Sequence, residues 1–289
     1  MLAIVNKELK TYFTSFTGYI FLAGFVFLMA LFFYIYNISG MSASYMNTLA
    51  NQETLIIFSV LIPILTMQLF SDEVKQHTDL LLYTSPISIT QIVVGKYIGA
   101  FCLFLIGMTV TSVFPIIINH FTEIAVAETI GVYVGFILLG ACFIGLGLFV
   151  SCLTNNTIVA AVSSFATIFL FYVLDGLALS MPTDRLSSMV FLGLLIVLIA
   201  FIVYDATKNI IAGIILVVPA TIIGIVLYIT NAMFYDALIF RVLSWFSVLR
   251  RFGTFGIGII AISDVVYYLS FTIAFVYLTI NTLEKRRWK

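Results

Sequence analysis

The chain has 289 residues, of which 63% are hydrophobic and only 9% charged, and its mean hydropathy is +1.20. Soluble domains carry about 25% charged residues, so too few polar side chains are present to cover a globule in water, and the solvent is expected to be lipid. The formal net charge is zero, so nothing points to nucleic acid as a partner. Spans of about 20 residues leave no room for a separate soluble domain, so we expect one all-α transmembrane domain over residues 1–289.

The first 16 residues differ from the apolar runs that follow them. Their apolar side chains recur at helical spacing, and polar side chains that include two lysines occupy the intervening face. This pattern predicts an amphipathic helix over residues 1–16 that lies in the membrane interface. An ordinary extension of the first span is the alternative. No small-residue cleavage pattern follows, so the first span is expected to be retained.

Eight apolar runs are expected to cross the membrane. They are residues 17–36, 54–70, 97–118, 130–150, 157–174, 189–204, 210–229 and 262–282. Pro63 should kink the second run and free a carbonyl that a neighbour must satisfy. Gly131-x-x-x-Gly135 permits close approach of another helix, including one of the same chain. Because 189–204 is short for a span, residues 189–229 form either a hairpin of two spans or a re-entrant pair.

Residues 230–260 show a different pattern from the spans on either side. Apolar side chains recur at helical spacing, but one aspartate and three arginines interrupt them and three glycines follow. The pattern predicts an amphipathic helix with a glycine-rich break, lying in the interface or re-entering it before the last span. Trp245 suits the level of the lipid headgroups.

The distribution of Lys and Arg predicts the orientation of the chain. With eight spans, one side holds nine of these residues and the other holds four, namely Arg185, Arg241, Arg250 and Arg251. Positive charge is enriched in cytoplasmic loops, so both termini are expected in the cytoplasm.

The sequence carries no pattern for catalysis or nucleotide hydrolysis. GxxxxGK[ST], HExxH and GxSxG are absent. His77 and His120 fall on opposite sides of the predicted membrane and cannot share a metal ion. The three cysteines fit neither a zinc site nor a disulfide framework, and we expect buried thiols. We therefore predict that the chain is not an enzyme.

Charged residues inside the spans would indicate an ion-coupled transporter. The spans are almost free of charge, and Asp175, Asp205 and Asp264 each stand at the end of an apolar run. They are expected to be satisfied carboxylates at the membrane surface. The energy for any transport would then have to come from outside the chain.

Residues 71–96 form the main polar segment on the predicted cytoplasmic side. Thr84-Ser85-Pro86 should stop a helix, and Ser88 can cap the helix that leads into the third span. A short helix over 78–83 would be held between two spans, so that a push from the cytoplasm would move both. A solvated loop is the alternative.

Three separated blocks of the chain carry a resemblance to a known family. They are Lys7-Glu8-Leu9-Lys10-x-Tyr12-Phe13; Asp72-Glu73, Thr78-Asp79, Leu81-Leu82, Thr84-Ser85-Pro86-Ile87-Ser88 and Gly95-Lys96; and Asp264-Val-Val-Tyr267-Tyr-Leu269-Ser270 with Glu284-Lys-Arg-Arg287. In this order they resemble the ABC-2 type permeases, especially those similar to the gliding-motility permease subunit. His77 and Leu80 stand where that pattern usually has Gly and Glu.

The resemblance implies the permease subunit of an ATP-driven exporter in the cytoplasmic membrane. Two permease chains, identical or related, would form the membrane core within the lipid, and separate ABC ATPase subunits would hold the ATP and Mg²⁺, with no cofactor in this chain. Residues 71–96 would be the coupling region. The residues expected to couple to the ATPase are Asp72, Glu73, Thr78, Asp79, Leu82, Thr84, Ser85 and Pro86. Residues 189–229 would be an insertion into a six-span plan, and 230–260 the outer re-entrant segment.

Two other functions remain open at this stage. One is an ion-coupled secondary carrier or a lipid flippase that works without ATP, and the other is a membrane scaffold without transport activity. Co-purification of an ATPase would discriminate the exporter from both. The 28 Phe and 15 Tyr residues would suit a lipidic cargo, but residues that face lipid have the same composition.

Overall fold

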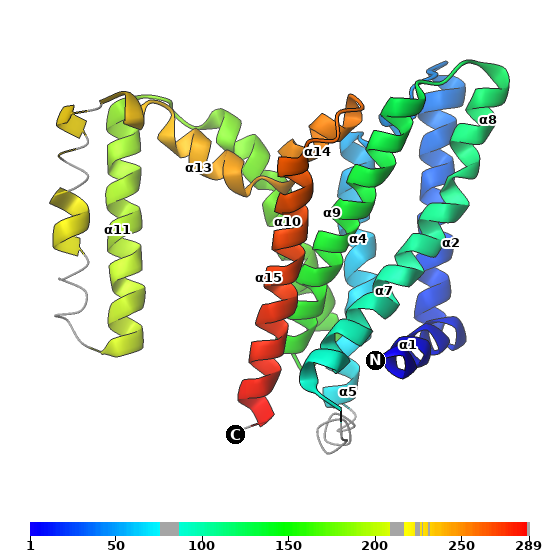
Figure 1. The fold of residues 1–289 in the computed structure, drawn as a ribbon, viewed down its shortest axis with the longest axis horizontal. Coiled ribbons are helices and arrows are strands. Elements are labelled where there is room, and N and C mark those ends of the chain that lie inside the picture. Colours follow the sequence, from blue (N-terminus) through cyan, green and yellow to red (C-terminus); the bar gives the residue numbers. More distant parts are fainter. Residues whose placement is uncertain (76–86, 209–216, 223–225, 227, 231, 288–289) are drawn as a thin grey trace. The chain divides into compact units, whose positions relative to one another are not determined.

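The computed structural model describes residues 1–75, 87–208, 217–222, 226, 228–230 and 232–287. Over these residues the regular structure is entirely helical, without strands, which confirms the predicted all-α class (Figure 1). The chain divides into two compact units, a larger one of Met1–Tyr172 and Val248–Lys289 and a smaller one of Val173–Ser247. Each unit is described by itself.

The larger unit is a bundle that contains most of the helices. They are α1 (Leu2–Thr14), α2 (Phe16–Phe32), the π-helix η1 (Phe33–Ser39), α3 (Met46–Leu49), α4 (Gln52–Thr66), α5 (Gln68–Lys75), α7 (Ile89–Thr111), α8 (Val113–Phe121), α9 (Val126–Leu153), α14 (Val248–Gly256) and α15 (Ile262–Arg287). Helix α10 (Thr157–Ser180) begins in this unit and ends in the smaller one. The smaller unit also holds α11 (Arg185–Thr207), the 3-10 helix η2 (Ala232–Tyr235) and α13 (Leu238–Phe246).

Seven helical segments of the described chain are long and apolar enough to cross a membrane. They are Phe16–Ser39, Gln52–Lys75, Ile89–Phe121, Val126–Leu153, Thr157–Ser180, Arg185–Asp205 and Ile262–Arg286. Each contains one of the predicted apolar runs, so the chain is a multi-pass membrane protein. The eighth predicted run, 210–229, lies mostly outside the described residues, so the choice between a spanning hairpin and a re-entrant pair stays a prediction.

Two helices extend beyond the ends expected from the sequence. Helix α10 continues past the expected end at residue 174 to Ser180, and α9 continues past the expected end at residue 150 to Leu153. Polar residues end a helix only where they offer the backbone another partner. The Asp175 side chain instead accepts a hydrogen bond from the Ser247 hydroxyl at 3.0 Å, which leaves the helical backbone intact.

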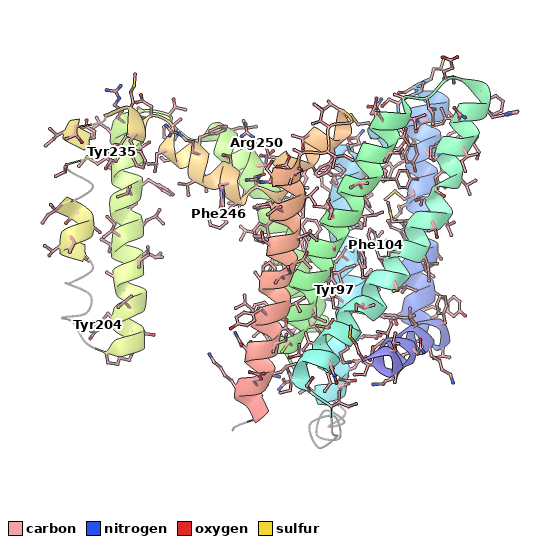
Figure 2. The ribbon with its side chains drawn as sticks, in the orientation of Figure 1. Tyr97, Phe104, Tyr204, Tyr235, Phe246 and Arg250 are labelled. Carbon is pink, nitrogen blue, oxygen red and sulfur yellow. The ribbon has the colours of Figure 1, made fainter. Side chains whose placement is uncertain are left out.

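Helix α9 lies at the centre of the larger unit. Phe136 on α9 packs against Phe58 on α4 and Phe104 on α7, with ring centroids 4.5 and 6.3 Å away. Phe104 and Tyr97 share one side of α7, as Figure 2 shows, and the Tyr97 hydroxyl donates to a backbone carbonyl of α9. These contacts bury the apolar faces of three helices in one core.

Gly131 and Gly135 on α9 allow α14 to approach closely. A Cβ at Gly131 would lie 2.6 Å from the Phe255 carbonyl oxygen, and one at Gly135 would lie 2.8 Å from the Phe255 Cβ. The GxxxG pattern therefore serves a contact within the chain, one of the uses it permits.

The predicted amphipathic segment 230–260 is built from η2, α13 and α14. The break between the two α-helices falls at Ser247, and the three glycines come later, within and after α14. Each α-helix has nine residues, too few to span a bilayer. Among the described residues of this segment no helix is long enough to span a membrane, in agreement with the prediction.

The start of α15 holds α14 in place. Asp264 lies 3.0 Å from the Arg251 guanidinium and accepts a hydrogen bond from the Thr254 hydroxyl at 2.8 Å. The Arg251 guanidinium also lies 4.2 Å from the centroid of the Tyr267 ring, and the Tyr268 hydroxyl donates to a carbonyl of α14 at 2.6 Å. Asp264 is thus a satisfied carboxylate, as expected.

Candidate functional site

The predicted coupling region joins α5 to α7 at the end of the larger unit where α1 also lies (Figure 1). Asp72 and Glu73 belong to α5. The other residues predicted to couple to an ATPase lie outside the described residues; they are Thr78, Asp79, Leu82, Thr84, Ser85 and Pro86. The Ser88 hydroxyl accepts a hydrogen bond from the Gln91 amide at 3.3 Å, so Ser88 caps α7 as predicted.

The helix of the second span breaks at Met67, between α4 and α5. The first amides of a new helix lack partners within that helix. Ser151 on α9 supplies such a partner, because its hydroxyl oxygen accepts hydrogen bonds from the Phe70 and Ser71 amides at 3.1 and 3.3 Å. The same hydroxyl donates its proton to the Met67 carbonyl at 3.1 Å. The break lies one turn after Pro63, which belongs to α4, and the kink expected at Pro63 itself stays a prediction.

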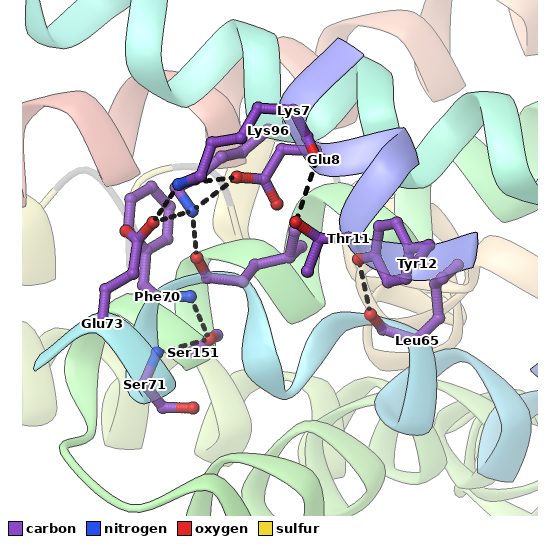
Figure 3. Close-up of polar contacts among 11 residues, drawn as sticks. Lys7, Glu8, Thr11, Tyr12, Leu65, Phe70, Ser71, Glu73, Lys96 and Ser151 are labelled. Atoms are coloured by element: carbon purple, nitrogen blue, oxygen red, sulfur yellow. Dashed lines mark hydrogen bonds and ion pairs between the residues drawn. The ribbon is translucent and has the colours of Figure 1, made fainter. Parts of the chain in front are cut away.

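Two further carbonyls beside the break are held by other helices. The Tyr12 hydroxyl on α1 donates to the Leu65 carbonyl at 2.9 Å, and the Lys96 ammonium on α7 donates to the Leu69 carbonyl at 2.6 Å (Figure 3). Helices α1, α7 and α9 therefore each satisfy one backbone oxygen around the break.

Lys96 is the buried centre of a cluster of charges. Its ammonium lies 3.1 Å from Glu8 on α1 and 2.8 Å from Glu73 on α5, and its side chain is only 2% exposed. Lys7 on α1 also pairs with Glu73, at 3.0 Å. Figure 3 shows the four side chains converging from three helices. Two lysines and two glutamates balance one another, as a buried charge requires.

Two glycines on α7 bring α1 close enough to form this cluster. A Cβ at Gly95 would lie 2.9 Å from the Ile4 side chain, and one at Gly99 would lie 2.8 Å from the Glu8 Cβ. Residues 1–16 thus contain the predicted helix, Leu2–Thr14, and it packs on α7. Its position in the membrane interface stays a prediction.

The electrostatics of the cluster keep two side chains of α1 protonated. Burial lowers the pKa of Lys7, but the attraction and hydrogen bonds of Glu73 and Glu8 outweigh it, and the pKa rises above its ordinary value. Burial and the nearby Glu8 charge raise the pKa of Tyr12. At neutral pH Lys7 is therefore a cation, and Tyr12 keeps the proton that it donates to the helix break.

A cavity of about 320 Å³ lies beside the cluster. It is lined by Lys7, Glu8, Thr11, Tyr12, Ser15, Thr17, Gln68, Leu69, Asp72, Glu73 and Lys96. Asp72 and Glu73, predicted as coupling residues, thus share one cavity wall. In the part of the chain that the structure describes, no group of His, Cys, Asp and Glu could hold a metal ion.

The sequence prediction omitted Lys7, Glu8 and Lys96 from the site. Lys96 was assigned to the polar segment, but it lies about two turns inside a long helix and is buried. The signal was present, because Lys7-Glu8 and Gly95-Lys96 both belong to the blocks that carry the family resemblance. Their pairing could not be inferred from either block alone.

The fold and this junction define a polytopic membrane protein with a polar contact region at one end. The sequence matches the family described as "ABC-2 family transporter protein" over residues 4–204, most of the chain, so the chain belongs to the ABC-2 transporter family. It is the permease component of an ABC transporter and is partnered by ABC ATPase subunits. A comparison with curated proteins gave no match.

Proposed function

We propose that this permease is part of an exporter and that separate ATPase subunits drive it through residues 71–96. Two permease chains, identical or related, form the core in the cytoplasmic membrane, with the termini and the coupling region in the cytoplasm. The ATPase subunits hold the ATP and Mg²⁺. The residues proposed for the contact are those predicted from the sequence, from Asp72 to Pro86.

The buried charge cluster supports this proposal most directly. The coupling region is joined at one end to α5 and at the other to α7, and Glu73 and Lys96 connect these two helices at 2.8 Å. Glu8 adds α1 to the same connection. A movement delivered to the coupling region would therefore reach three helices together, whereas an isolated solvated loop would transmit little.

Co-purification tests the partnership. The tagged chain is expressed in its own host, purified in mild detergent and analysed by mass spectrometry. We expect an ABC ATPase in a fixed ratio to the chain, with ATPase activity that depends on the complex. A chain that captures no ATPase and stimulates none would favour the carrier, flippase or scaffold.

Substitution of the proposed contact tests coupling. We expect the double variant Thr84→Ala/Pro86→Ala to lose most of the stimulation that the permease gives the ATPase, because Pro86 ends the proposed coupling helix. The matched control is Pro182→Ala/Thr183→Ala, which makes the same changes in the turn between α10 and α11. Stimulation and transport that are unchanged in the first variant would remove the coupling role.

A further inference from the structure

The cavity beside the charge cluster has walls rich in hydrogen-bond acceptors. The three donors of the Lys96 ammonium are used by Glu8, Glu73 and the Leu69 carbonyl. The Lys7 ammonium is held by the same two glutamates, at 3.6 and 3.0 Å. Neither lysine therefore offers an uncommitted charge to the cavity.

Hydroxyl groups in the cavity walls also donate their protons to acceptors within the protein. Thr11 donates to the Lys7 carbonyl and Thr17 donates to the Gln68 side-chain oxygen, both at 2.9 Å. Tyr12 donates to the helix break. A hydroxyl that has given its proton keeps its lone pairs, so these oxygens can only accept from an occupant.

Asp72 is the charged group of the walls that stays without a counter-ion. Lys7 and Lys96 are balanced by Glu8 and Glu73, and no ion pair or hydrogen bond joins Asp72 to another residue that the structure describes. Lys75 and Lys96 attract it through space, but Lys75 is exposed and does not line the cavity, and Lys96 is already balanced by Glu8 and Glu73. The lining therefore carries one uncompensated negative charge.

We propose that this cavity receives a lysine or arginine side chain of the ABC ATPase subunit, whose cation pairs with Asp72. The inference rests on the proposed function, since it takes the cavity to face the ATPase beside the coupling region. Charge complementarity carries it: acceptor-rich walls and an unpaired carboxylate suit a cation with several donors. The volume, equivalent to about ten water molecules at ~30 Å³ each, leaves room for the end of a long side chain.

The first test changes the charge of Asp72 in the full-length permease. The probe is the ABC ATPase that co-purifies with the wild-type chain, and its affinity is measured on the permease in detergent. We expect Asp72→Asn, which keeps the shape, to weaken binding roughly three- to tenfold, and Asp72→Arg to weaken it by more than tenfold. The matched control is Glu123→Arg, the same reversal at an exposed site between α8 and α9, and it should leave affinity unchanged.

The second test restores the pair. In the Asp72→Arg background, each basic residue of the ATPase that crosslinks near α5 is changed to glutamate, and one of these changes should recover at least half of the lost affinity. Unchanged affinity in Asp72→Asn, or failure of every reversal to rescue Asp72→Arg, overturns the inference while the wild-type complex still supports the proposed function. An Asp72→Asn variant that binds the ATPase normally but loses co-purified phosphatidylethanolamine would assign the cavity to a lipid ammonium group and also overturn it. A wild-type chain that binds no ATPase defeats the proposed function itself.

Discussion

At the scale of single residues, Lys96 is a buried cation that two carboxylates hold in place. A lysine in lipid or protein interior is costly unless it is paired and hydrogen-bonded. Its ammonium meets two carboxylates and a carbonyl, and it also lies 5.1 Å from the centroid of the Phe70 ring. Loss of this one cation would leave Glu8 and Glu73 with the half-exposed Lys7 as their common counter-ion.

We therefore expect Lys96→Met to destabilise the protein by about 3–5 kcal/mol, the range for breaking a buried pair. Thermal unfolding of the purified chain in detergent, followed by size-exclusion chromatography, measures the loss. Lys10→Met is the control, because Lys10 is exposed on α1, and its effect should stay within about 0.5 kcal/mol. A Lys96→Met variant as stable as the control would show that the pairing contributes nothing.

The role of Lys96 shows what sequence patterns omit at this scale. The Ser88 cap was predicted and is confirmed, because a cap and the amide that it binds are three residues apart. Lys96 and Glu8 are separated by 88 positions, and no local period relates them. Their contact depends on two glycines that let α1 lie against α7, and that packing is visible only in three dimensions.

At the scale of elements, the break between α4 and α5 depends on a hydroxyl from a third helix. Ser151 is fully buried and serves two amides and one carbonyl. Its removal would leave buried backbone groups without partners, which costs about 1–3 kcal/mol for each unsatisfied group.

We expect Ser151→Ala to lower stability by an amount in this range and to speed hydrogen–deuterium exchange in the peptide that contains Phe70 and Ser71. Exchange measured by mass spectrometry separates this local effect from general unfolding. Ser180→Ala is the control, since Ser180 is exposed and its hydroxyl bonds only within α10. Exchange at α5 that matches the wild type would contradict the assigned role.

The sequence located elements better than it located their ends. All predicted spans within the described residues are present, because long apolar runs leave a helix as the way to satisfy the backbone in lipid. The sequence predicted a helix end at Asp175-Gly176. The Ser247 hydroxyl donates a hydrogen bond to the Asp175 carboxylate instead, and the helix continues. A helix end depends on tertiary partners, which the local sequence does not contain.

At the scale of the whole molecule, the order of the spans determines which loops share a side. The N-terminal helix α1 and the last turn of α15 lie at the same end of the larger unit, where the Arg286 side chain contacts the Leu153 carbonyl (Figure 1). This arrangement fits the predicted even number of crossings. The segment over residues 189–229 decides whether that number is eight or six.

Cysteine labelling at position 207 distinguishes the two topologies. Eight spans place this position in the cytoplasm, so Thr207→Cys, in a chain whose three native cysteines are replaced by Ala, should react with a membrane-impermeant maleimide in inside-out vesicles and remain unlabelled in intact cells. Thr122→Cys, in the exposed loop between α8 and α9, should give the opposite result. Labelling of position 207 only from outside the cell would exclude the eight-span topology.

The interrupted helix of the second span has a mechanical consequence. A helix broken at Met67 would ordinarily act as a hinge, and a force at the end of α5 would be lost in bending. Here the three carbonyls around the break are fastened to three different helices, at 2.9, 3.1 and 2.6 Å. Bending at this point would rupture bonds to all of them, so the joint is stiff. Work delivered at the end of α5 would therefore displace α1, α7 and α9 as one block, and any opening it produces belongs toward the opposite end of the bundle.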